Sequence, residues 1–87
     1  MIIHVRRKHI KQGVQGDPKN CPIALAMIDC KIMHPSVCSR QVHYGEMMGR
    51  QVAHLSTRVQ KFILKFDCKK SVKPFSFRLN VGKDGGR

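Results

Sequence analysis

The final third of the 87-residue chain changes from a helical to an extended hydrophobic period, and this change limits the fold more than any other feature. Apolar residues with the i, i+3, i+4, i+7 spacing of one helix face stand at Val59, Phe62, Ile63 and Phe66. After Pro74, apolar residues alternate with polar ones, as in a half-buried strand, at Phe75, Phe77, Leu79 and Val81. The sequence therefore predicts a helix over 57–68, capped by Ser56, and then a strand over 75–81.

The N-terminal part of the chain predicts a strand, a loop and a second helix. Residues 1–5 fit a short strand, and the glycines and turn residues of 12–19 fit a loop. Pro22 suits the first turn of a helix, which the dipeptide His34-Pro35 ends. This helix is apolar over most of its surface, so we expect it to be mostly buried against a sheet.

Two further strands complete the predicted order. They lie at 37–44 and 49–55 and form a β-hairpin through the connection at 45–48. The resulting β-α-β-β-α-β order matches the ferredoxin-like arrangement, in which an antiparallel sheet carries two helices on one face. A chain of this length predicts one α+β domain, at 1–81, with a flexible tail at 82–87.

The charge balance is strongly basic, with 17 Lys and Arg against five Asp and Glu and a formal net charge of +12 at pH 7. A small domain needs only about 2–8 net charges for solubility, so the excess indicates an anionic partner. Nucleic acid is the commonest such partner, because each neutralised phosphate releases a condensed counterion. An acidic protein surface satisfies the same physics. The candidate binding residues form two clusters, which are Arg6, Arg7, Lys8 and Lys11, and then Arg58, Lys61, Lys65, Lys69, Lys70 and Lys73.

The chain carries little catalytic or metal-binding material. Paired carboxylates for acid–base chemistry are absent, and Cys21, Cys30, Cys38 and Cys68 include no closely spaced pair of the kind that zinc sites use. We therefore expect no enzyme activity, no metal and no cofactor. A Cys–His nucleophile or metal site, for example Cys38 with His43, is the disfavoured alternative.

The sequence predicts a cytoplasmic protein with reduced thiols and no membrane contact. The longest nearly unbroken apolar stretch, 21–28, is far shorter than the roughly 20 residues of a membrane span. The first residues also lack the apolar segment of a secretory signal. Because so small a chain has a thin core, homodimerisation is an open alternative.

Sequence-specific recognition of RNA is disfavoured. An RNA-recognition module would stack bases on aromatic residues of a central strand, and the corresponding strand at 49–55 has none. The four phenylalanines, at Phe62, Phe66, Phe75 and Phe77, fit a hydrophobic core instead. We therefore expect nucleic-acid contacts mainly with phosphate and with little sequence readout.

Several segments resemble small uncharacterised proteins of bacteriophages and bacteria. They are His9 to Gly13, Asp17, the CPIALA helix at 21–26, Val59 to Asp67 and the segment Pro74-Phe75-Ser76-Phe77. The resemblance implies a compact α+β domain in a phage or mobile-element setting, and it brings no established activity, ligand or site. In that setting, small non-enzymatic proteins often act by occluding host machinery, including CRISPR effectors.

Two functions are therefore expected, in order of preference. The first is a small, basic, non-catalytic module that contacts the phosphate backbone of DNA or RNA with little sequence specificity. The alternative is a phage-encoded protein–protein inhibitor, such as an anti-CRISPR type blocker of a host nucleoprotein, that docks its basic face on an acidic surface. A phage-encoded protein would act in the cytoplasm of the host cell.

Overall fold

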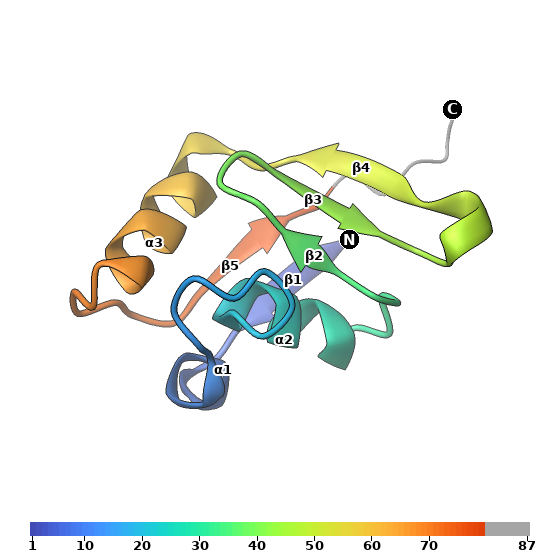
Figure 1. Ribbon diagram of the computed structural model, residues 1–87. Helices are drawn as coiled ribbons and strands as arrows, with labels where there is room; N and C mark the ends of the chain where they lie inside the picture. The colour runs from blue at the N-terminus through green and yellow to red at the C-terminus, as the bar shows by residue number, and fades with distance from the viewer. Residues whose placement is uncertain (80–87) are drawn as a thin grey trace.

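The computed structural model describes residues 1–79, so the predicted strand end at 80–81 and the predicted tail at 82–87 lie outside the described residues. The described chain folds into a compact α+β arrangement with a Cα radius of gyration of 12.1 Å (Figure 1). Its elements, in chain order, are β1 (Ile2–Val5), α1 (Arg7–Gln12), α2 (Pro22–Asp29), β2 (Ser36–Val37), β3 (Gln41–Tyr44), the 3-10 turn η1 (Met47–Gly49), β4 (Gln51–His54), α3 (Thr57–Asp67) and β5 (Phe75–Arg78).

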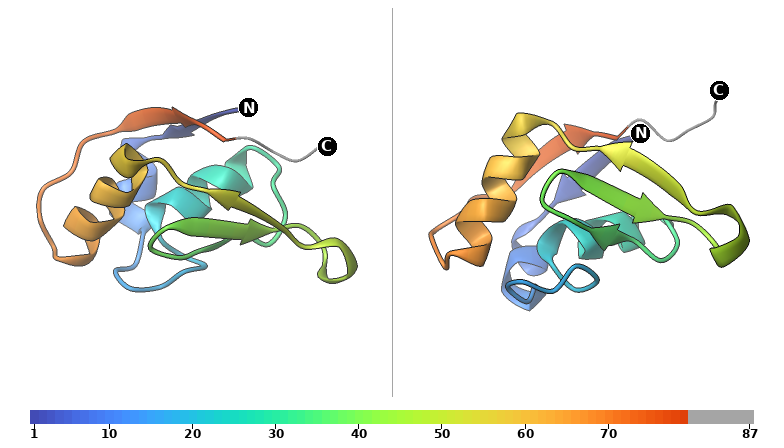
Figure 2. Two further views of the ribbon diagram at one scale, coloured as in Figure 1. Left: turned by 90° about the horizontal axis from the view of Figure 1, so that it is seen from above. Right: turned by 45° about the horizontal axis from the view of Figure 1, so that its top comes forward.

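The strands of the described residues form two antiparallel sheets instead of one. Strand β1 pairs with β5, with Val5 opposite Phe75, and β2, β3 and β4 form the other sheet. Helix α2 lies between the two sheets (Figure 2) and packs against both β1 and β2. The predicted α+β class is confirmed, but the single ferredoxin-like sheet is not formed within residues 1–79.

The apolar character of α2 explains why the sheet is divided. Ile23, Ala24, Ala26 and Met27 are all inaccessible to solvent. A helix that is apolar over so much of its surface needs cover on more than one side. One sheet can cover only one side of a helix, whereas two sheets enclose α2 from two directions.

The predicted strand at 37–44 is wrong, because this segment forms two short strands joined by a tight turn. Cys38 N–H donates to the carbonyl of Gln41 at 2.7 Å, and Val37 lies opposite Val42. Both valines are buried. Successive side chains of a straight strand alternate between its faces, so residues five apart would face opposite sides. The hairpin brings both valines to the core side. The hairpin that the sequence predicted is confirmed between β3 and β4, which pair antiparallel.

Helix α3 follows its predicted period and cap. Val59, Phe62 and Phe66 are buried in the single core cluster, and Ser56 Oγ accepts the N–H of Val59 at 3.4 Å. The helix lies along one side of the domain, beside β5 (Figure 1). None of the helices in the described part of the chain is long and apolar enough to cross a membrane.

Helix α1 was not predicted, since the sequence has no Ser, Thr, Asp or Asn at its start. His9 takes the place of a cap: its Nδ1 accepts the N–H of Arg6 at 2.9 Å. Because Nδ1 is the acceptor, Nε2 carries the hydrogen and donates it to Asp29 Oδ2 at 2.7 Å. The buried imidazole therefore joins α1 to the end of α2. The basic run 6–11, which was expected to lead into a loop, is largely helical.

Candidate nucleic-acid interface

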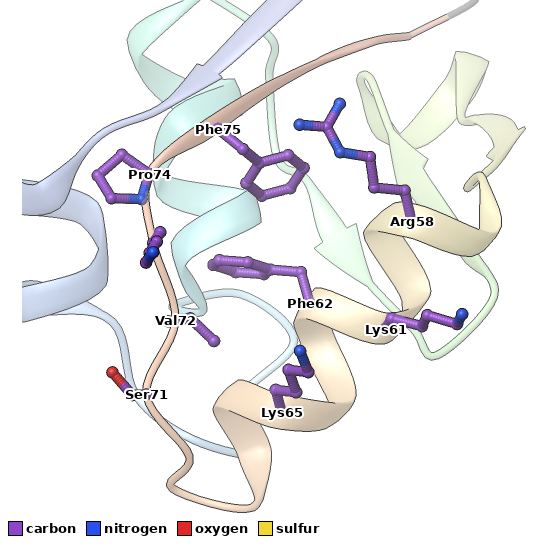
Figure 3. A pocket seen from close by; sticks show the side chains of 9 residues that line it. Arg58, Lys61, Phe62, Lys65, Ser71, Val72, Pro74 and Phe75 are labelled. Carbon is purple, nitrogen blue, oxygen red and sulfur yellow. The ribbon is translucent and has the colours of Figure 1, made fainter.

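A groove runs between α3 and the extended segment that leads into β5 (Figure 3). Its volume is about 540 Å³. The residues that line it are Arg58, Lys61, Phe62, Lys65, Ser71, Val72, Lys73, Pro74 and Phe75. Four of the ten predicted binding residues therefore meet at one surface feature, although they are up to 15 positions apart in the chain.

The course of the chain after α3 creates the groove. Lys69 adopts a left-handed conformation with φ of 60°, and the N–H of Lys70 donates to the carbonyl of Lys65 at 2.9 Å. This pattern is a Schellman motif, which ends the helix and reverses the chain. The chain then runs back beside α3 and enters β5, where Phe75 pairs with Val5.

Two phenylalanines form the floor of the groove. The rings of Phe62 and Phe75 point toward one another, with centroids 4.7 Å apart and planes inclined by 38° (Figure 3). This is a favourable aromatic geometry, which fixes both rings. Phe62 is buried, while Phe75 is only partly buried and presents apolar surface to the groove. The prediction of a core residue is confirmed for Phe62, whereas Phe75 is only partly buried against the core and also belongs to the groove.

Arg58 is held in place above this floor. Its Cζ lies 5.1 Å from the centroid of the Phe75 ring, within cation–π distance. One of its terminal nitrogens, Nη1, donates to the carbonyl of Ser76 at 3.2 Å. The side chain nevertheless stays exposed, so a charged planar group is both oriented and accessible to a ligand.

Three lysines complete the charge of the groove. Lys61 and Lys65 follow Arg58 at helical spacing on α3, and Lys73 approaches from the opposite wall. All three are exposed, and no carboxylate of residues 1–79 lines the groove. Asp67, the acidic residue of α3, accepts the N–H of Gly16 at 3.0 Å through Oδ1 and is thereby directed to the loop before α2.

The first basic cluster, on and beside α1, is partly neutralised. Lys8 Nζ lies 3.0 Å from Asp29 Oδ2, the same oxygen that accepts from His9. These hydrogen bonds, from His9 and then from Lys8, hold the pKa of Asp29 below its usual value. Arg6, Arg7 and Lys11 are exposed.

The register of the β1–β5 sheet brings the two clusters toward the same end of the molecule. Val5 ends β1 opposite Phe75, which begins β5. The residues just beyond the pair, Arg6 on one strand and Pro74 on the other, therefore leave the sheet side by side. Lys69 and Lys70 follow the end of α3 and do not line the groove.

The cysteines have no shared site in the described residues, where no group of three or more metal-binding side chains occurs. All four are free thiols. Burial raises the pKa of the Cys21 thiol, and its Sγ accepts the N–H of Ala24 at 3.5 Å as the cap of α2.

No protein-family model, curated protein or solved structure matches the chain. The groove residues that sequence reasoning missed are the apolar ones and Ser71, above all Val72, Pro74 and Phe75. One local signal points to them: Arg58, Lys61 and Lys65 flank the apolar stripe of their helix, so a segment packed on that stripe would complete a basic groove.

Proposed function

We propose that the protein is a small non-catalytic module that binds the phosphate backbone of nucleic acids with little sequence specificity. The observation that carries this proposal is the groove beside α3, where four exposed cations converge with no carboxylate among the lining residues. Cations without a nearby counter-charge retain their full attraction for phosphate. The released counterions then supply most of the binding free energy.

Low specificity follows from the chemistry of the same residues. Lysine meets phosphate as a flexible point charge and discriminates poorly between bases. Asn, Gln, Asp and Glu, which read the edges of adenine and cytosine, are absent from the groove lining. The exposed cations on and beside α1 (Arg6, Arg7 and Lys11) extend the surface for the backbone beyond the groove.

A salt titration with a matched pair of variants tests this function. Lys61→Gln/Lys65→Gln removes two groove charges, and Lys19→Gln/Lys31→Gln removes two exposed charges that line a different surface. Binding to a labelled oligonucleotide is measured between roughly 50 and 200 mM salt. The groove variant is expected to reduce the slope of log K against log salt by about 1.4, at about 0.7 per lost contact with a single strand. The control variant should reproduce the wild-type slope.

Two results would overturn the proposal. One is the absence of binding to any nucleic acid at low salt. The other is an equal loss in both variants, because this would mean that the net charge attracts the oligonucleotide and that the groove has no special part.

A second surface favours the alternative function, docking on an acidic protein. A hollow of about 970 Å³ lies at the end of α2, where Ile28 and Met33 are each 48% exposed. Lys19, Lys31 and Arg50 line it as well. Exposed apolar groups surrounded by cations suit an acidic protein surface with apolar anchors. In the phage setting that the sequence resemblance implies, such docking would make the protein an inhibitor of host machinery.

Affinity capture after nuclease treatment tests the alternative. Docking at the hollow would be established by an acidic partner that meets three conditions. It also binds the purified protein, its binding is lost in Met33→Glu, and its binding is kept in Lys61→Gln/Lys65→Gln. A partner that disappears with the nuclease would instead reflect bridging by nucleic acid.

A further inference from the structure

The groove beside α3 combines its cations with an apolar floor. A site that contacts only phosphate does not need apolar surface. In a duplex the bases are stacked on one another, so a protein reaches the phosphates, the sugars and the base edges but not the flat faces of the bases. A single strand can instead present its unstacked bases to apolar and planar groups. The partly buried ring of Phe75 and the exposed guanidinium of Arg58 are groups of this kind.

We infer that the groove binds single-stranded nucleic acid in preference to duplex, with a base stacked on the Arg58–Phe75 pair and phosphates on the surrounding lysines. The inference rests on the proposed function and names its substrate class. Bases stack on arginine guanidinium planes as well as on aromatic rings, and such stacking tolerates any sequence because every base has a π-face.

Arg58 is suited to stacking because it is already immobilised. The Phe75 ring lies on one side of it, and the carbonyl of Ser76 accepts one of its N–H groups at 3.2 Å. An ordered side chain loses little conformational entropy when a ligand binds. The Phe62 ring supports Phe75 from within the core, so the platform is a row of three planar groups anchored on α3 and β5.

The size and the walls of the groove agree with this assignment. Its 540 Å³ falls within the roughly 300–1,000 Å³ of pockets that enclose small organic ligands, a class that includes a nucleoside. Lys61 and Lys65 belong to α3, and Lys73 belongs to the segment on the other side of the groove, which leads into β5. A backbone that runs along the groove therefore meets positive charge on both sides of its bases.

The test compares affinities for oligothymidylate of about 15 nucleotides, a length typical of single-strand sites, and for a duplex of equal length. A purely electrostatic site would favour the duplex, whose charge density is higher. We expect the single strand to bind at least about fivefold tighter, because stacking adds to the contact with phosphate.

The variant Arg58→Lys keeps the charge and removes the planar group. It is expected to weaken single-strand binding about fivefold to tenfold and to leave duplex binding within about twofold. A 2-aminopurine base placed in the oligonucleotide reports stacking directly: its emission should change on binding to the wild type and much less on binding to Arg58→Lys. Arg78→Lys, on an exposed residue outside the groove, is the matched control and should change neither readout.

The outcomes separate this inference from the proposed function. Equal or tighter binding of duplex, or equal effects of Arg58→Lys and Arg78→Lys, would overturn single-strand stacking and leave backbone binding intact. Failure of both oligonucleotides to bind at low salt would overturn both. A loss of thermal stability in Arg58→Lys that matches its loss of affinity would assign the residue a structural role and overturn stacking.

Discussion

The two basic clusters contain the same kinds of side chain but differ in their surroundings. On α1, Lys8 is paired with Asp29, and the neighbouring His9 is buried against the same carboxylate. Beside α3, Arg58 and three lysines line a groove to which the described part of the chain contributes no carboxylate. A cation that is already paired with a carboxylate neutralises less of the charge of a phosphate, so its contact displaces fewer of the counterions condensed on the nucleic acid. Net charge therefore predicts a class of partner, and the positions of the described acids would help to decide where such a partner binds.

The clusters also differ in shape. The cations of α1 stand on a short convex helix, where water screens them. Those of α3 face a second wall of the protein, and Phe62 and Phe75 form the floor between the walls. A concave site focuses the electrostatic field of its charges, which strengthens their attraction for an anion.

The largest expected difference between the two clusters is in the affinity that is lost when two positive charges are removed from one cluster or from the other. Lys61→Gln/Lys65→Gln is expected to weaken binding of a single-stranded oligonucleotide about 20-fold at about 100 mM salt, the effect of two lost phosphate contacts. Arg7→Gln/Lys11→Gln removes the same charge from α1 and should cost only about threefold, since these residues meet the strand beyond the groove. Fluorescence anisotropy measures both. Equal losses would show that the clusters contribute alike.

Removing the carboxylate that pairs with Lys8 should make the α1 cluster bind nucleic acid more like the groove does. In Asp29→Asn, Lys8 loses its partner and one negative charge disappears, so affinity should rise about threefold to fivefold at low salt. The same variant weakens the hydrogen bond of the buried His9 and should lower the melting temperature. Anisotropy and thermal unfolding measured on the same samples separate the two effects. Unchanged affinity with a lower melting temperature would mean that α1 does not contact nucleic acid.

Substitution of Lys69, which lies outside the groove, tests whether affinity depends on a cation's place in the groove or only on the positive charge near α3. Its φ of 60° is costly for any residue except glycine, so Lys69→Gly should increase the free energy of unfolding by about 0.5–1 kcal/mol. Because Lys69 does not line the groove, affinity should fall less than about threefold. Lys69→Ala, which removes the same charge and keeps the strain, is the control for chemical denaturation. A large loss of affinity in both variants would extend the site past the end of α3.

The parts of this fold that the sequence predicted correctly depend on local signals. Helix α3 has a clear apolar period and a Ser56 cap, and α2 has Pro22 in its first turn. The errors concern the strand at 37–44 and the number of sheets, which both depend on how the whole core is covered. A hairpin at 38–40 is chosen because Val37 and Val42 must both reach the core, and the division into two sheets depends on cover for α2. Neither requirement can be seen within a short window of sequence.

The same limit applies to the site. The helical spacing of Arg58, Lys61 and Lys65 is itself enough to predict that these cations lie on one flank of α3. The opposite wall could not be predicted, because it requires the chain to reverse at Lys69 and the next strand to pair with β1. The role of Phe75 in the groove follows from that pairing, since an alternating apolar pattern only indicates that the residue faces inward.

The smallest expected effect is a pH response confined to α1. Hydrogen bonds from His9 and Lys8 keep the pKa of Asp29 in the folded protein below the usual 3.8. A lowered carboxyl pKa adds stability that is present above the unfolded value and is lost as the pH falls through the folded value. Amide hydrogen exchange of Gly13, whose N–H donates to the carbonyl of His9 at 2.8 Å, should therefore lose protection below about pH 4, while the amides of α3 stay protected.

In Asp29→Asn the acid-induced change at Gly13 should be much smaller, because the carboxyl that titrates is gone. Loss of protection in α1 and α3 at the same pH, in the wild type and the variant alike, would contradict a local cause. Among the described residues, no carboxylate lines the groove, so its capacity for phosphate should persist at a pH where the hydrogen bonds that join α1 to α2 are already broken. The two basic clusters would then differ in acid response for the same reason that they differ in binding: within residues 1–79, a cation of the α1 cluster is paired with a carboxylate, and the cations that line the groove are not.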